Sequence, residues 1–223
     1  MRRQLLTITV IALAGVLMLA GCKRKEIDTL NTGSHLVFTA TTSDNGDDGG
    51  KTTLTPYGGT LWTSGDKINI YDNDSTTAVY VLSDGANTNE GTFEFYYGTP
   101  LTGSAFTAAY PSDMVSTMAS KSVTFTLPAT QELVANSFGN GAAPMVAYSE
   151  SGSTEFSFYN ACAGICIPMI GSDDNICVSQ ITVTASDYDI TGSYTVSGFD
   201  SDTAPTSIVA VSGGGRVITL SSD

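Results

Sequence analysis

The residue types that most often carry catalysis are sparse in this sequence. The chain has 223 residues and one histidine, His35, which lies among polar residues before the first predicted strand. A serine nucleophile ordinarily needs a histidine base held by a carboxylate. The sequence contains no nucleophile elbow, no phosphate-binding Gly-Lys-Ser/Thr loop and no dinucleotide fingerprint after a strand. We therefore predict a protein that is not an enzyme and that holds no cofactor.

Acidic residues gather in short runs that raise the question of a metal site. One run is SDNGDDGG, at residues 43–50. An EF-hand loop counted from Asp44 requires glutamate at its twelfth position, where this chain has Thr55. We interpret this run, and those at residues 72–74, 173–174 and 200–202, as solvated loops, and we predict no metal site.

Three cysteines, Cys162, Cys166 and Cys177, follow residue 150. Their number is odd, so they cannot all pair within the chain. Cys162 and Cys166 are four residues apart in a predicted strand, about 13 Å along it, which is too far for a disulfide without a bend. Cys177 lies across a predicted hairpin and could reach either of them. Three alternatives stay open: buried free thiols acting as small hydrophobic side chains, one disulfide, or a zinc site with an incomplete ligand set.

Four aromatic residues, Tyr57, Trp62, Tyr96 and Tyr97, could form a platform on which sugars stack. At strand spacing beside apolar positions, such residues are more often part of the core or of a strand edge. We therefore keep a surface glycan-binding protein only as the alternative function.

The amino terminus has the layout of a bacterial lipoprotein signal. Arg2 and Arg3 precede an apolar run of 15 residues, 5–19, which is too short to span a membrane comfortably. The run ends in Leu-Ala-Gly-Cys, which is typical of a lipobox cut before Cys22. We predict a signal peptide at residues 1–21 and a lipid-anchored tether at residues 22–34, and acyl chains on Cys22 would bind the membrane at about 0.8 kcal/mol per buried methylene. A plain signal peptide or a retained anchor helix is the alternative.

The charge of the chain is strongly acidic after the tether begins. From residue 26 onward, four Lys and Arg residues stand against all 22 Asp and Glu residues, a net charge of −18. Nucleic-acid binding by counterion release needs clustered cations. We therefore expect no nucleic-acid partner.

Composition and the spacing of apolar residues predict an all-β protein. The chain has 23 Gly and is rich in Thr, Ser, Val and Ile. A hairpin is predicted in which a four-residue loop joins Trp62 to Lys67. Alternating or continuous apolar runs predict strands at residues 36–40, 67–71, 78–82, 92–97, 105–110, 121–128, 145–148, 156–170, 176–184, 189–196, 207–211 and 216–220.

The apolar pattern changes near residue 150, where we place a domain boundary. An N-terminal β-sandwich domain would cover residues 35–150 and a C-terminal β domain residues 151–223. The run at residues 156–170 is almost continuously apolar, which is typical of a strand buried on both faces. About 70 residues are few for a sandwich whose seven strands need about 100. The second domain is therefore expected to be short or incomplete, or to take its last strand from elsewhere.

A series of short motifs follows the predicted anchor. They are Thr-x-Leu at 52–54, Trp-x-x-Gly-Asp-x-Ile at 62–68, Gly-Thr-Phe at 91–93, Ala-Tyr-Pro at 109–111, Leu-Pro-Ala-Thr-Gln at 127–131, Phe-Ser-Phe-Tyr-Asn at 156–160 and Ile-Thr-Gly at 190–192. In order and spacing they resemble the fimbrillin-like lipoproteins of Bacteroidota over residues 36–198. In that resemblance the family core comprises Leu54, Trp62, Gly65, Asp66, Ile68 and Ile70.

The resemblance implies a two-domain, transthyretin-like β-sandwich exported as a lipoprotein to the outer membrane and exposed on the cell surface. Members are stalk, anchor or tip subunits of adhesive pili, or related surface proteins. In polymerising subunits an arginine-specific protease removes the first strand, and a strand of the next subunit fills the groove by β-augmentation. Here the first strand would comprise Leu36, Val37, Phe38, Thr39 and Ala40.

Two features depart from that family pattern. No arginine lies between Arg24 and Arg216, so an arginine-specific cut after the first strand has no site, and Lys51 is the only basic residue nearby. This favours an anchor, a tip or a non-polymerising relative over a stalk subunit. Basic residues also follow Cys22 where many surface-exported lipoproteins of this group carry acids. The expected partners are the membrane, other pilus subunits joined by strand addition, and a ligand on a host or bacterial surface.

Overall fold

The computed structural model describes residues 35–42, 53–54, 60–135, 138–139, 142–169 and 177–222. The predicted signal peptide, the tether, the lipidation site Cys22 and Lys51 lie outside these residues. From residue 35 onward the chain forms one compact unit. Its described secondary structure consists of strands and one short 3-10 helix, η1 (Ser112–Met114).

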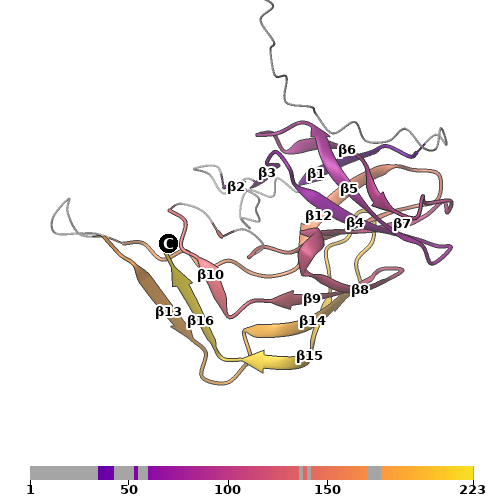
Figure 1. Cartoon of the computed structure of the whole chain (residues 1–223). Coiled ribbons are helices and arrows are strands. Elements are labelled where there is room, and N and C mark those ends of the chain that lie inside the picture. Colours follow the sequence, from indigo (N-terminus) through magenta and orange to yellow (C-terminus); the bar gives the residue numbers. More distant parts are fainter. Residues whose placement is uncertain are drawn as a thin grey trace, which may run out of the picture. The chain divides into compact units, whose positions relative to one another are not determined.

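The predicted all-β class is confirmed, and strands lie at most of the predicted places (Figure 1). In β4, for example, alternate side chains are buried and their neighbours are half-buried, as a period of two requires. The transthyretin-like arrangement stays a prediction. The strands are β1 (Phe38–Thr42), β2 (Thr53–Leu54), β3 (Thr60–Leu61), β4 (Lys67–Asp72), β5 (Thr77–Asp84), β6 (Glu90–Gly98), β7 (Phe106–Tyr110), β8 (Val115–Ala119), β9 (Ser122–Leu127), β10 (Thr130–Glu132), β11 (Met145–Ser149), β12 (Glu155–Asn160), β13 (Gln180–Thr184), β14 (Thr191–Ser197), β15 (Ser207–Gly215) and β16 (Val217–Ser221).

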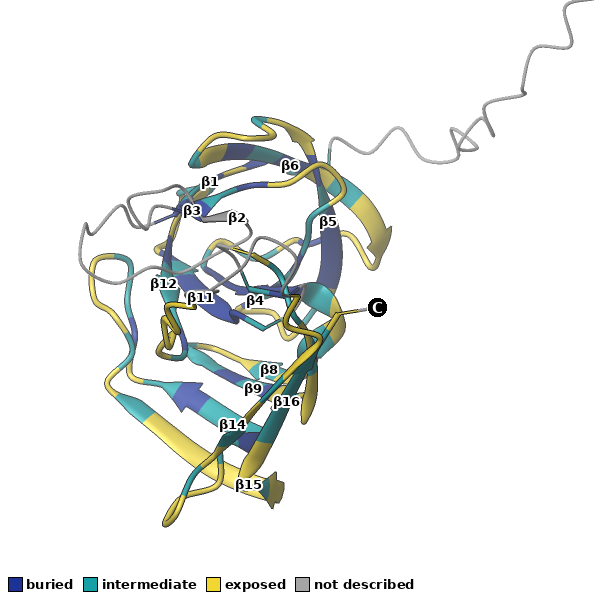
Figure 2. Ribbon diagram, turned by 90° about the vertical axis from the view of Figure 1, so that its left-hand side faces the viewer, coloured by how far each residue is buried: buried dark blue, intermediate teal, exposed yellow. Residues whose placement is uncertain are grey.

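Seven strands pair in the order β1-β12-β11-β7-β4-β5-β6, and β1 closes this ring because it pairs with both β12 and β6. Neighbours in the ring are antiparallel, except that β1 and β12 are parallel. Burying one large apolar side chain contributes about 1.5–3 kcal/mol. The ring encloses a core of buried residues, and buried residues are dark blue in Figure 2; the fully buried members of the core include Phe38, Trp62, Ile68, Ile70, Tyr80, Phe93, Phe156 and Phe158.

The predicted hairpin between Trp62 and Lys67 is wrong. Trp62 follows β3, which pairs with β2, whereas Lys67 begins β4, which pairs with β5 and β7. Residues 63–66 do make a turn between them. The Trp62 amide donates to the Thr88 carbonyl at 2.8 Å, and the Asn87 amide donates to the Trp62 carbonyl at 2.7 Å. Turn residues in a sequence reveal a bend, but they do not show which strands pair across it.

The predicted strand at residues 156–170 is wrong in its second half. β12 ends at Asn160, and residues 161–169 form no strand. Ile165, in the middle of this apolar segment, is 69% exposed. Pro168 has no amide hydrogen with which to extend a ladder. Only Ala161, at its start, joins a buried cluster; residues 163–169 are exposed although the segment is apolar in composition.

Two smaller sheets hold most of the later strands. One has the order β15-β14-β9-β8 and the other β10-β16-β13. The first sheet packs on β7 and β11 of the ring. A second buried cluster joins them, formed by Ala109, Val123, Phe125, Val146, Ala161, Val196 and Phe199. None of the residues of β10, β13 and β16 is buried, and β15 is exposed along most of its length, as its yellow colour in Figure 2 shows.

Strand pairing crosses the boundary predicted near residue 150 in both directions. β12 follows that boundary but belongs to the ring, where it pairs with β1 and β11. β9 and β10 precede it but pair with β14 and β16. The division into domains at residues 35–150 and 151–223 stays a prediction, and the sheets group the strands differently.

Candidate functional site

Trp62, the only tryptophan of the chain, is fully buried beside β1. Its ring meets Phe93, Tyr110 and Phe158 edge to face, with ring centroids 5.0, 5.6 and 5.4 Å apart. Its indole N–H donates a hydrogen bond to the carbonyl of Ala40, in β1, at 3.2 Å. Each such aromatic pair contributes about 0.5–1.5 kcal/mol beyond the area that it buries. Trp62 therefore ties β1 to β6, β7 and β12.

Several of the sequence motifs meet at this tryptophan. Phe93 ends the Gly-Thr-Phe motif, Tyr110 is the centre of Ala-Tyr-Pro, and Phe158 belongs to Phe-Ser-Phe-Tyr-Asn. A side chain at Gly91 would displace its neighbours, because a Cβ there would lie 2.6 Å from Cδ1 of Leu82 and 2.9 Å from Cδ1 of Trp62. Motifs that are far apart in the sequence thus supply parts of one packed cluster. Their shared role in the structure is packing.

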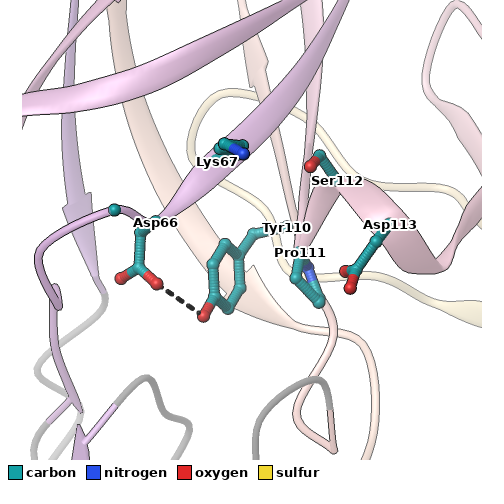
Figure 3. Close-up of a pocket in the computed structure, with 7 residues that line it drawn as sticks. Asp66, Lys67, Tyr110, Pro111, Ser112 and Asp113 are labelled. Atoms are coloured by element: carbon teal, nitrogen blue, oxygen red, sulfur yellow. Dashed lines mark hydrogen bonds between the residues drawn. The ribbon is translucent and has the colours of Figure 1, made fainter.

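The turn after Trp62 is held by Asp66. Its Oδ2 accepts a hydrogen bond from the Thr63 amide at 2.6 Å, and its Oδ1 accepts one from the Tyr110 hydroxyl at 3.0 Å (Figure 3). Gly65 has φ +91°, a left-handed conformation that other residues rarely adopt. Burial, and then the negative charge of Asp66, raises the pKa of the Tyr110 hydroxyl above its usual value. The Trp-x-x-Gly-Asp motif is thus a turn whose aspartate reaches the tyrosine of Ala-Tyr-Pro.

An open, polar pocket of about 220 Å³ lies beside this turn. Most small-molecule sites are more apolar and have volumes of about 300–1,000 Å³. Two hydrogen bonds already engage the carboxylate of Asp66 in the pocket wall. His35 does not line the pocket; its ring stacks on that of Phe95, with centroids 4.3 Å apart. The lining residues, drawn in Figure 3, are Gly65, Asp66, Lys67, Tyr110, Pro111, Ser112 and Asp113.

Asp72, interpreted from the sequence as a loop residue, is a fully buried carboxylate at the end of β4. Its Oδ1 accepts hydrogen bonds from the amides of Asp74 and Thr76, at 3.1 and 2.8 Å. Its Oδ2 accepts them from the amides of Thr102 and Gly103, at 3.1 and 3.0 Å. The carboxylate therefore joins two loops. The alternation of β4 could have predicted that Asp72 is buried, because this residue lies on the same inward face as the two isoleucines before it.

The other residues of the predicted family core lie in or beside the ring. Ile68 and Ile70 are fully buried in β4. Leu54 lies in β2, where it pairs with Thr60, and its side chain is outside what the structure describes.

The first strand begins at Phe38, two residues later than predicted. Phe38 and Ala40 point into the core and Thr39 is exposed, as the alternation predicts. Leu36 is half-buried against the core, and Val37 is 47% exposed.

The three described cysteines are free thiols. Cys162 is half-buried, and burial raises the pKa of its thiol to about 11. Cys166 and Cys177 are exposed, so the interpretation of all three as buried hydrophobic side chains is wrong for these two. Residues 163–169, which include Cys166, are all exposed. In the part of the chain that the structure describes, no three His, Cys, Asp or Glu side chains gather as metal ligands.

The sugar platform, which the sequence allowed only as an alternative to core packing, cannot include all four aromatic residues. Trp62 is buried and cannot present its ring to a ligand. Tyr57 lies outside the described residues. Tyr96 and Tyr97, which are next to each other in β6, are exposed.

The geometry of this region is suited to holding a strand in place. β1 lies between two other strands, and Trp62 fixes it from inside through a hydrogen bond to its backbone. Across the described ranges, no helix has the length and apolar character needed to cross a membrane. Comparison with protein-family models, curated proteins and solved structures yields no match to this chain.

Proposed function

We propose that this chain is a fimbrillin-like lipoprotein of the outer membrane, an anchor, tip or other accessory component of adhesive pili that assembles by β-strand exchange. The observation that carries the proposal is the position of β1. This five-residue strand lies between β6 and β12 and closes the ring. It is the first strand of the compact unit that follows the predicted tether.

β1 covers a continuous set of aromatic side chains. The ring of Phe38 lies 5.0 Å from that of Tyr80, 5.0 Å from that of Phe106 and 5.2 Å from that of Phe156. Without β1 these rings would line a groove between β6 and β12, whose facing backbone N–H and C=O groups would lose their partners. Unpaired backbone groups and exposed rings are both costly, so the groove favours another strand in the same place.

The backbone of the groove accepts a strand of either direction. β1 is antiparallel to β6 and parallel to β12, so a reversed strand would be parallel to β6 and antiparallel to β12. Each direction gives one parallel and one antiparallel neighbour, and parallel pairing is slightly the weaker. The side chains of the incoming strand must therefore select the direction. A strand that places a large apolar side chain at the position of Phe38 and a small one at that of Ala40 meets this requirement.

The basic residues of the chain support an anchor or tip over a stalk subunit. Arginine-specific removal of the first strand has no site, because no arginine lies between Arg24 and Arg216, so β1 would leave the groove uncut, by exchange with a partner's strand. The predicted lipid on Cys22 would keep this component at the membrane. The packing role of the Trp62 motifs supports a structural protein as well, since their polar atoms are used within the fold.

The test is co-expression of the full chain with the products of neighbouring pilus genes. We expect SDS-resistant ladders on gels of unboiled samples and fimbriae in electron micrographs, with the protein in the membrane fraction. A Cys22→Ser variant, which cannot be lipidated, should release the protein from the membrane. A protein that stays strictly monomeric and produces no fimbriae would contradict the proposal.

A further inference from the structure

Two exposed tyrosines stand together on the outer face of the ring. Tyr96 is 49% and Tyr97 58% exposed, and their ring centroids are 5.4 Å apart. Successive residues of a strand normally point to opposite faces. β6 has a bulge here, because Tyr97 pairs with Val79 and Phe95 pairs with Tyr80, which leaves Tyr96 as the extra residue. Bulges re-aim side chains and are common beside functional sites.

A lysine lies over one ring of this tyrosine pair. The ammonium nitrogen of Lys67 is 4.6 Å from the centroid of the Tyr96 ring. Of the three cations in the described ranges, Lys121 and Arg216 each form an ion pair with an aspartate, whereas Lys67 has no ion-pair partner among the described residues. A cation over a ring is attracted by its π-electrons, and an ammonium has three N–H donors. Lys67 can therefore orient Tyr96 and still donate to a ligand.

We propose that Tyr96, Tyr97 and Lys67 form a binding site for a neutral glycan. The C–H bonds on one side of a pyranose ring form an apolar face that packs flat on an exposed aromatic ring. Tyr97 offers the more exposed ring for this contact. The sugar hydroxyls would accept hydrogen bonds from Lys67 and donate them to Glu94, which is exposed on the same strand.

The size of the site favours a sugar over a protein partner. A fully buried tyrosine covers about 150–250 Å², so two half-exposed ones offer roughly 200 Å². A stable protein interface needs about 800 Å² from each partner. Apolar small molecules prefer concave sites, and the open pocket beside Asp66 includes neither tyrosine. A flat aromatic site of this area, flanked by a donor and an acceptor, fits one or two sugar rings.

The charge of the protein favours a neutral glycan over an acidic one. From residue 26 onward the net charge is −18, four Lys and Arg residues against 22 Asp and Glu residues. A surface of this charge repels polyanions at long range. One lysine held over a tyrosine does not reverse that repulsion.

Affinity gel electrophoresis tests the proposal. The full chain, in a mild detergent, is run through gels that contain laminarin, galactomannan, xyloglucan or polygalacturonate. We expect at least one of the three neutral polysaccharides to retard it and polygalacturonate to have no effect. Tyr97→Ala should weaken the retardation about tenfold, the loss of one aromatic contact, and Lys67→Met should weaken it less. The matched control is Tyr188→Ala, which removes a tyrosine that is 80% exposed outside this site.

Several outcomes would overturn the proposal. They are no retardation by any neutral polysaccharide, retardation by polygalacturonate alone, or equal losses for Tyr97→Ala and Tyr188→Ala. Because the tyrosines are exposed, and Lys67 is half-buried without an ion pair among the described residues, the variants should keep the circular dichroism spectrum and urea midpoint of the parent protein. The inference does not depend on the proposed role in pili, so either can fail alone.

Discussion

Two buried tyrosines of the ring predict opposite results for the same substitution. The hydroxyl of Tyr110 donates to Asp66 Oδ1 at 3.0 Å, whereas the buried hydroxyl of Tyr80 has no hydrogen-bond partner among the described residues. Tyr110→Phe removes a hydrogen bond to a charged group, and we expect it to lower the free energy of unfolding by about 1.5–2 kcal/mol. Tyr80→Phe removes an uncompensated buried hydroxyl, and we expect it to raise that free energy by about 1 kcal/mol.

The assay is urea unfolding at pH 7, followed by circular dichroism and by the fluorescence of Trp62. Both variants lose one oxygen atom, so each is the control for the other in size and burial. The difference between them should be about 2.5–3 kcal/mol. Destabilisation of similar size by both substitutions would refute the reasoning, because the hydroxyl of Tyr80 would then be a bonded group.

The pH dependence of the free energy of unfolding supplies a second test of the buried Tyr80 hydroxyl. Burial, and then the charge of Asp72, raises the pKa of Tyr80 to about 12. The folded state therefore holds this proton more tightly than the unfolded state, whose tyrosine pKa is about 10. This contribution to stability is complete below pH 10 and is lost as the pH rises toward 12. Tyr80→Phe should reduce the loss of stability above pH 10. If the free energy of unfolding falls as steeply with pH in the variant as in the parent protein, the raised pKa does not belong to Tyr80.

Three further predictions concern the core, a loop carboxylate and the thiols. Gly91→Ala should destabilise the protein by about 1–3 kcal/mol in urea unfolding, because its methyl group would overlap the tryptophan ring. Asp72→Asn should cost about 2–4 kcal/mol in the same assay, since an amide NH₂ would face backbone donors. Alkylation at pH 8, mapped by mass spectrometry, should modify the exposed Cys166 and Cys177 much faster than Cys162, whose pKa is about 11.

Local patterns predicted strands well, and pairing between strands poorly. The alternation of residues 67–71 placed β4 within one residue of its observed end, because a period of two has one structural explanation. The turn after Trp62 was also readable from its Gly and Asp. Nothing local shows that β12 lies beside β1, since this contact joins distant parts of the chain. The apolar run at 156–170 was misread because composition does not determine what covers a segment.

The candidate site was predictable in its members but not in its geometry. One motif contained Trp62 and Asp66 and another contained Tyr110, and only the fold brings the tyrosine hydroxyl to the aspartate. The pairing of Tyr96 with Tyr97 on one face depends on a bulge, which alternation alone cannot predict.

A disulfide between β1 and β6 tests most directly whether β1 is exchanged. Thr39 and Thr92 are directly opposed in β1 and β6, at a spacing suited to a disulfide. The two are replaced by cysteine after the native cysteines beyond residue 150 have been changed to serine. The control pair is Thr124 and Thr195, whose hydroxyls are 2.9 Å apart on β9 and β14, away from β1. Strand exchange predicts that oxidation of the first pair abolishes SDS-resistant ladders, that reduction restores them, and that the control pair has no effect. Ladders that persist with β1 locked would contradict it.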